Sequence, residues 1–252
     1  MKKSPITLLL ALSTLSLASD DRPPITNTST LPTHFGILLT PSIDPTDIFG
    51  PLGVLSALSM YYINSTGKMH LSLLAPTLSH STTNPPLANL DFGADLVPTL
   101  TFDEYEAGAS ESGPLHVLLV PGGGGARMNV SREIAFVKKV YPSLRYIISV
   151  CTGSTLLARA GVLDHRRATT NKKAWAWASS FGNNVSYQGA ARWVRDGNVY
   201  TGSGVAAAID TAYAFVGDVY GEEVSRWVAD ASEYTRWENA SFDPFAERWG
   251  VV

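Results

Sequence analysis

The only cysteine of the chain, Cys151, stands where a strand pattern gives way to a helix pattern. The run "RYIISV" before it is apolar and β-branched, and "TGSTLLARA" after it is typical of a helix. A residue on such a turn resembles a nucleophile elbow, whose side chain faces the N–H groups of the following helix. These groups and the helix dipole favour the thiolate. We therefore expect Cys151 to be a nucleophile, with Thr152 beside the reacting centre and Gly153 permitting the tight turn.

The residues alone leave other roles for Cys151 open. A free cysteine packs like a small hydrophobe, so a structural role would need no chemistry. His165 follows the expected helix and could pair with the thiol, but "LDHRR" fits a solvated turn equally well. The five histidines show no H-x-x-x-H or H-E-x-x-H spacing, so we expect no metal.

Two further loops follow apolar strands, and we expect both to meet Cys151. Asp47 to Pro51 comes after "HFGILLT", and Gly122 to Gly125 comes after "LHVLLV". In an open parallel sheet, ligands bind at the carboxyl ends of the strands, where such loops converge. Asp47 would move protons to and from the thiol, its pKa raised by the nearby negative charge, although a capping role is also typical of Asp. The glycines would present backbone N–H groups to a developing oxyanion.

No nucleotide cofactor is expected. The stretch "PGGGGARMN" fits neither G-x-x-x-x-G-K-[ST] nor G-x-G-x-x-G, and "GSGVAA" lies too near the end of the chain for a dinucleotide site. The net charge is −3 and the basic residues form no long cluster, which makes nucleic acid an improbable partner. A small-molecule substrate is the expected partner.

The elements that must position these residues alternate between strand and helix. We expect one α/β domain over residues 34–252, with a mostly parallel sheet covered on both faces. A hairpin turn is expected at Asp196-Gly197. Residues 76–113 show only short β-like pieces such as "LVPTLTF". Strands are expected at 34–40, 69–75, 115–120 and 145–150, and helices at 52–62, 131–140 and in a closing pair from Val205.

The N-terminus is typical of a secreted protein. Residues 1–18 combine two lysines, an apolar run too short to span a bilayer and small residues, as in a signal peptide that leaves no membrane anchor. Residues 19–33 read as a flexible leader. Five of the ten asparagines stand in N-x-[ST] sequons, more than chance would give, which favours secretion and glycosylation. They are Asn27, Asn64, Asn129, Asn184 and Asn239.

Four stretches of the chain resemble the ThiJ/PfpI superfamily. They are "DIFGP", "LLVPGGGGA", "SVCTGSTLLARAGVLDHRRATT" and "VYTGSGVAAAIDTAYAFV", and the combination is most similar to the isonitrile (isocyanide) hydratase branch and its fungal relatives. The resemblance implies a flavodoxin-like three-layer sandwich, usually a homodimer, with the cysteine on an elbow and no cofactor.

The same resemblance implies roles for single residues. Cys151 would be the nucleophile, Asp47 the proton donor and acceptor, and Thr152 an active-site neighbour. Asn171 stands where many relatives have the histidine of "ATTHW", so the usual base of a Cys-His mechanism is missing. Asp210 could equally be a helix-surface carboxylate. The residues expected to bind the oxyanion or the substrate are Gly50, Gly123, Gly124, Asn171 and Asp210.

The function implied is a cysteine-dependent hydratase that turns an isonitrile into an N-substituted formamide. Two alternatives stay open. One is a glyoxalase or deglycase acting on α-oxoaldehydes, although the glutamate and histidine of those branches are missing here. The other is a non-enzymatic secreted protein that senses a ligand or oxidation through its thiol.

Overall fold

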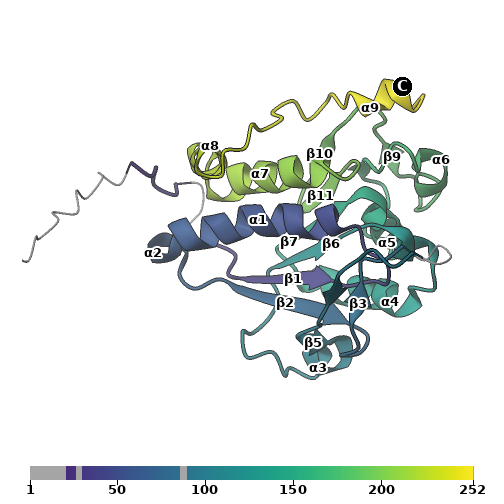
Figure 1. Cartoon of the computed structure of the whole chain (residues 1–252), viewed down its shortest axis with the longest axis horizontal. Coiled ribbons are helices and arrows are strands. Elements are labelled where there is room, and N and C mark those ends of the chain that lie inside the picture. Colours follow the sequence, from purple (N-terminus) through teal and green to yellow (C-terminus); the bar gives the residue numbers. More distant parts are fainter. Residues whose placement is uncertain (1–20, 27–29, 86–89, 252) are drawn as a thin grey trace, which may run out of the picture.

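Seven strands form one sheet through the centre of the protein (Figure 1). The computed structural model describes residues 21–26, 30–85 and 90–251. Neighbouring strands are parallel throughout except for the hairpin at one edge. In order across the sheet the strands are β10 (Trp193–Asp196), β11 (Val199–Gly202), β7 (Tyr146–Val150), β6 (Val117–Val120), β1 (His34–Leu38), β2 (His70–Ala75) and β5 (Leu100–Thr101).

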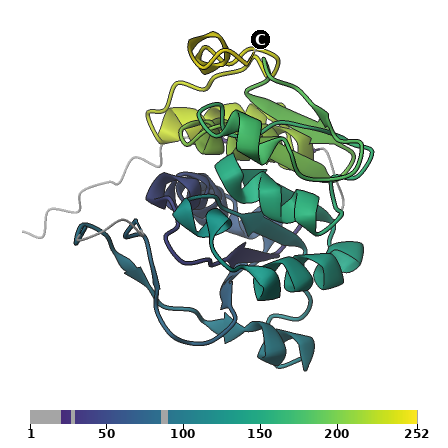
Figure 2. The ribbon, with the colours of Figure 1, turned by 90° about the vertical axis from the view of Figure 1, so that its right-hand side faces the viewer.

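Helices cover both faces of this sheet, which gives the three layers seen in Figure 2. Short strands outside the sheet pair as β3 (Ser81–Thr82) with β4 (Asp95–Leu96) and β8 (Arg167–Ala168) with β9 (Ser186–Tyr187). The helices are α1 (Pro45–Tyr61), α2 (Ile63–Thr66), α3 (Phe102–Glu106), α4 (Ser131–Val140), α5 (Ser154–Arg159), α6 (Trp175–Ala178), α7 (Ala207–Tyr220), α8 (Glu222–Ala231) and α9 (Phe245–Arg248).

The period-2 alternation of side chains along the strands divides the apolar residues into two cores. Phe35 and Ile37 of β1 pack in the core beneath α1, α7 and α8. Leu38 points to the opposite face and joins the core beneath α4 and α5. The expected fold class, a flavodoxin-like sandwich around a mostly parallel sheet, is confirmed.

The expected strands and the helix over 131–140 agree with the structure to within two residues at each end. The first helix differs, because α1 begins at Pro45 rather than near Leu52. Its N-cap is Asp44, whose carboxylate accepts a hydrogen bond from the Thr46 N–H at 3.0 Å, and Pro45 occupies the first turn. Asp47 therefore lies in the first turn of a helix rather than in a loop before one.

Residues 1–18, the expected signal peptide, lie outside the described residues. The described part of 19–33 has neither helix nor strand, but Ile25 and Leu31 pack against the core. The Tyr220 hydroxyl also donates to the Pro32 carbonyl at 3.1 Å. Within the described residues, none of the helices has both the length and the apolar character that a bilayer crossing needs.

Four of the expected glycosylation sites can be placed. Asn64, Asn129, Asn184 and Asn239 are all exposed, whereas Asn27 lies outside the described residues. Exposure is a requirement for modification of a sequon in a folded protein.

Candidate active site

Cys151 occupies a strained backbone position at the end of β7. Its φ is 56°, a left-handed conformation that residues other than glycine adopt rarely. Its N–H donates to the Ser203 carbonyl at 2.8 Å. Its own carbonyl accepts hydrogen bonds from the hydroxyls of Ser154 and Thr170, each at 3.1 Å. These three bonds hold the strained residue in place, and the expected elbow is present.

The turn after Cys151 packs directly onto the end of β6, as the sequence predicts for Gly153. A Cβ on Gly153 would lie 2.1 Å from the Val120 carbonyl oxygen, so only glycine fits there. A Cβ on Gly122 would lie 2.6 Å from the Thr152 nitrogen and 3.0 Å from Asp47 Oδ2. The loops after β1, β6 and β7 therefore meet at one point.

Asp47 is fully buried at this point, with 0% of its surface exposed. Its Oδ2 accepts a hydrogen bond from the Gly122 N–H at 2.9 Å, while Oδ1 forms no regular hydrogen bond with the described residues. Burial, and then the negative charge of Asp44, raise the pKa of Asp47 to about 8. The Gly122 N–H and the Cys151 thiol act in the opposite direction, but more weakly. Asp47 therefore holds a proton at neutral pH.

The thiol of Cys151 is also buried, with 6% of the residue exposed. Burial, and then the negative charge of Asp47, raise the pKa of this thiol. The Thr152 N–H and hydroxyl favour the thiolate, but they do not overcome these effects. The N–H group at this turn thus acts on the thiol in the expected direction, but the expectation that Cys151 is held as a thiolate is wrong, because burial and the charge of Asp47 have the larger effect.

Asn171 supplies a hydrogen bond to the sulfur. Its Nδ2 lies 3.2 Å from Cys151 Sγ, and its Oδ1 accepts from the Ala174 N–H at 2.9 Å. The second bond determines which end of the amide faces the sulfur. An amide cannot act as a base, so Asn171 can only stabilise negative charge on the sulfur.

The glycine loop holds Thr152 in position. The Gly123 N–H donates to Thr152 Oγ1 at 3.0 Å, and the φ of Gly123 is 127°. This N–H is therefore directed at Thr152 and not at an oxyanion, contrary to the expectation for Gly123. Gly124 begins a 3-10 turn and lines a pocket of about 520 Å³ together with Asp44 and Arg127.

Two other expected substrate-binding residues have structural roles. A Cβ on Gly50 would lie 2.8 Å from Ile209 Cγ1, so this glycine allows α1 and α7 to pack closely. Asp210 is buried, and its Oδ2 pairs with Arg192 at 2.6 Å. Its Oδ1 accepts from the Tyr234 hydroxyl at 2.9 Å and from the Trp237 N–H at 3.0 Å. Both oxygens of Asp210 are thus occupied by the protein itself.

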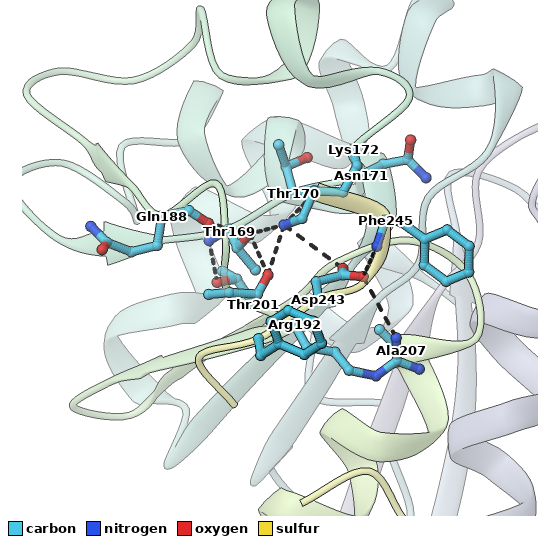
Figure 3. Close-up of polar contacts among 12 residues, drawn as sticks. Thr169, Thr170, Asn171, Lys172, Gln188, Arg192, Thr201, Ala207, Asp243 and Phe245 are labelled. Atoms are coloured by element: carbon cyan, nitrogen blue, oxygen red, sulfur yellow. Dashed lines mark hydrogen bonds and ion pairs between the residues drawn. The ribbon is translucent and has the colours of Figure 1, made fainter. Parts of the chain in front are cut away.

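A cluster of buried charges that the sequence did not reveal lies next to Asn171. Lys172, Arg192 and Asp243 converge in Figure 3, and Asp210 completes the group. Lys172 Nζ donates to Thr169 Oγ1 and to the Ala191 carbonyl, each at 2.7 Å, and lies 3.9 Å from Asp243. Burial lowers the pKa of Lys172 to about 8. A lysine in the run "NKK" reads as exposed, and no local signal in the sequence identifies its partners.

A pocket of about 300 Å³ opens beside this cluster. Asn171 is among its lining residues, so the pocket adjoins the side chain that contacts the Cys151 sulfur. Across the described ranges, no three His, Cys, Asp or Glu side chains are arranged to hold a metal ion. The remaining lining residues are Lys172, Lys173, Ser203, Gly204, Val205, Ala206, Asp243, Phe245 and Trp249.

The sheet order, the three layers and the cysteine elbow define a flavodoxin-like α/β protein with a buried thiol–carboxyl pair. The model of the DJ-1/PfpI family matches residues 87–218. The chain belongs to this family, as the sequence resemblance implied.

Three known proteins are similar to this chain. An isonitrile hydratase from Pseudomonas putida is 32% identical over 203 residues, which cover 80% of this chain and 78% of the relative. The transcriptional regulator GbdR from Pseudomonas aeruginosa is 29% identical over 139 residues, which cover 53% of this chain and 36% of the relative. A crystal structure of a ThiJ/PfpI family protein from Pseudomonas syringae has a TM-score of 0.67 at 24% identity, with 96% and 91% of the two chains covered.

Proposed function

We propose that this protein is a cysteine-dependent hydratase that converts isonitriles into N-substituted formamides. The observation that carries the proposal is the pair formed by Cys151 on its elbow and the buried, protonated Asp47. The 32% identity to an isonitrile hydratase over most of both chains supports the choice of substrate.

The first half of the reaction forms a covalent adduct. The reaction starts from the fraction of the protein in which Asp47 has lost its proton to solvent. This carboxylate takes the thiol proton, and the thiolate attacks the terminal carbon of R–N≡C, forming a C–S bond. Asp47 then delivers the proton to the same carbon, which gives the thioimidate R–N=CH–S–Cys151. The Asn171 amide stabilises the thiolate before attack, because its N–H donates to the sulfur.

The second half uses water and regenerates the thiol. Asp47, now a carboxylate, takes a proton from water as the oxygen adds to the carbon and passes that proton to the nitrogen, which gives R–NH–CH(OH)–S–Cys151 and leaves Asp47 ionised. The C–S bond then breaks, the hydroxyl proton returns to the sulfur through Asp47, and R–NH–CHO leaves. The sum is one isonitrile and one water for one formamide, with no cofactor and no redox step.

The test is the appearance of formamide, measured by mass spectrometry, when the purified protein meets a panel of isonitriles. Cys151→Ala and Asp47→Asn should each reduce turnover at least about 100-fold, the usual scale for loss of a nucleophile or a proton-transfer group. Asp230→Asn changes an exposed aspartate on α8 and is the matched control, expected to keep normal turnover. A wild-type protein inactive on every isonitrile would rule the hydratase out.

Ligand sensing is the second candidate, and the similarity to the regulator GbdR favours it. A sensor would bind a small molecule without turning over isonitriles or methylglyoxal. Turnover of methylglyoxal instead would support the glyoxalase or deglycase alternative. Isonitrile turnover, methylglyoxal turnover and ligand binding can all be measured on the same purified protein.

Secretion and glycosylation are part of the proposal. The N-terminal pattern and four exposed sequons support them. Expression in a secreting eukaryotic cell should place the protein in the medium, with a mass that falls on treatment with an N-glycosidase. Retention in the cell without glycans would contradict this part.

A further inference from the structure

We propose that the pocket between the Asn171–Lys173 loop and the C-terminal segment binds the uncharged organic group of the substrate. The pocket is the 300 Å³ cavity described above, and residues 243–249 form its outer wall. The inference rests on the proposed function, because it names the class of isonitrile that the site would take. An apolar group, alkyl or aromatic, is the expected occupant.

The position of the pocket relative to the thiol is the first argument. Asn171 lines the pocket, and its Nδ2 lies 3.2 Å from Cys151 Sγ. Ser203, which also lines it, accepts the hydrogen bond from the Cys151 N–H. A substrate whose reactive carbon meets the sulfur can therefore extend its substituent past Asn171 into this pocket.

The charges at the base of the pocket are the second argument. The side chains of Lys172 and Asp243 are each only 2% exposed. Lys172 Nζ is bound by Thr169 and Ala191. Asp243 accepts from the Phe245 N–H at 3.0 Å and lies 3.8 Å from Arg192 (Figure 3). Lys172 and Asp243 are therefore already compensated within the protein, and neither is open to a charged ligand. Lys173, the other charged lining residue, is exposed to solvent, and its Nζ lies 5.9 Å from the centre of the Trp249 ring. A buried unpaired charge on the substrate would be costly.

The apolar wall is the third argument. Phe245 and Trp249 are 51% and 45% exposed, which is unusual for aromatic side chains beside a cavity. Val205 and Ala206 also line the pocket. An apolar substituent would cover these rings and remove their surface from water.

The experiment compares methyl isonitrile with benzyl isonitrile in wild-type protein and in Ala206→Trp. Ala206 is exposed at the start of α7, so the indole can fill the pocket without disturbing the core. The variant should raise KM for benzyl isonitrile at least about 10-fold and change kcat/KM for methyl isonitrile less than about 2-fold. Ala231→Trp, on the exposed end of α8, is the matched control and should change neither.

A charged substrate gives a second comparison. Isocyanoacetate should have a kcat/KM at least about 10-fold below that of its methyl ester, because Lys172 is already bound by the protein and the exposed Lys173 is screened by water. An equal kcat/KM for isocyanoacetate and its methyl ester would overturn the assignment of the pocket. So would an equal fall in kcat/KM for methyl and benzyl isonitrile in Ala206→Trp.

Alkylation separates this inference from the proposed function. The rate ratio of N-benzyl iodoacetamide to iodoacetamide at Cys151, followed by mass spectrometry, should fall at least about 5-fold in Ala206→Trp. This readout needs no turnover. An inactive wild-type protein with the expected fall in ratio means that the hydratase proposal fails and the pocket assignment stands. An unchanged ratio means that the pocket assignment fails, whatever the turnover.

Discussion

At the scale of single residues, the negative charge of Asp47 opposes the ionisation of Cys151. Burial raises both pKa values, and the charge of Asp47 raises that of the thiol further. A protonated Asp47 removes this charge, so the state with one proton on the carboxyl and none on the sulfur is the reactive one. The pair reaches this state when Asp47 loses its proton to solvent and then takes the proton of the thiol.

Asp47→Asn should separate thiol reactivity from catalysis. Removing the negative charge lowers the pKa of Cys151, because a like charge no longer opposes the thiolate. The midpoint of Cys151 alkylation by iodoacetamide, measured against pH, should therefore fall by about one unit or more while turnover is lost. A midpoint that stays or rises would show that Asp47 does not act on the sulfur through its charge.

The same substitution should stabilise the protein in alkaline solution. The pKa of Asp47 is raised from 3.8 to about 8, so its contribution to folding is complete below pH 3.8 and is lost as the pH rises through 8. The cost above pH 8 is on the order of 5 kcal/mol. Asn carries no charge and avoids this cost.

Thermal unfolding checks this prediction. The Tm of Asp47→Asn should exceed that of the wild type by about 5 °C or more at pH 8.5, with a much smaller difference near pH 4. Asp230→Asn should leave Tm unchanged at both pH values. Equal Tm values for wild type and Asp47→Asn at pH 8.5 would mean that the buried carboxyl carries no such cost.

The sequence allowed only part of the site to be predicted. Cys151 and Asp47 follow apolar strands, and strand order brings such positions together, so their meeting could be expected. The direction in which the thiol pKa shifts could not be predicted, because it depends on how deeply the sulfur is buried. The roles of Asp210 and Gly50 also depend on contacts with Arg192 and Ile209, which no local pattern shows.

At the scale of elements, the cluster of Lys172, Arg192, Asp210 and Asp243 ties four segments together, and Lys172 comes from the loop between β8 and α6. Asp243 belongs to the C-terminal segment, Arg192 to the stretch before β10, and Asp210 to the first turn of α7. Two positive and two negative charges balance in the interior. Loss of one partner leaves a buried charge without compensation, which typically costs about 3–5 kcal/mol.

Asp243→Asn should therefore destabilise the protein by about 3 kcal/mol in chemical denaturation. The reason is the uncompensated Lys172, whose pKa should fall further because Asp243 normally raises it. The neutral pair Lys172→Met with Asp243→Asn should recover at least about half of the loss, which a double-mutant cycle measures. A double variant no more stable than Asp243→Asn would show that packing, not charge, holds the segment.

The helices and strands were predicted best where a single hydrophobic pattern is enough to identify the element. Strands β1, β6 and β7 are continuous apolar runs, and α4 has one apolar face, so their positions could be predicted. The start of α1 could not be predicted, because a proline such as Pro51 is typical of the first turn of a helix, whereas Pro51 lies inside α1. The strands over residues 76–113 are two residues long and have no periodicity to detect.

At the scale of the whole molecule, α1 presents an exposed stripe of large apolar and small side chains. Phe49 and Met60 are exposed on one side of this helix, with the small residues Gly53 and Ser56 exposed between them. These positions fall on one face at the helical period. Large apolar side chains flanking small ones allow two helices to approach closely. This arrangement supports the homodimer that the sequence resemblance implies.

Gly53→Arg tests the homodimer without disturbing the fold. A Cβ at Gly53 meets nothing within 4 Å, and arginine is a better helix former than glycine, so the monomer should be at least as stable. A charged side chain in the middle of the stripe should weaken association at least about 10-fold in sedimentation equilibrium. Lys68→Glu, which changes charge at an exposed position outside the stripe, is the control and should leave association unchanged. A wild type that sediments as a 27.0 kDa monomer, or a Gly53→Arg variant that still dimerises normally, would mean that α1 is not the interface.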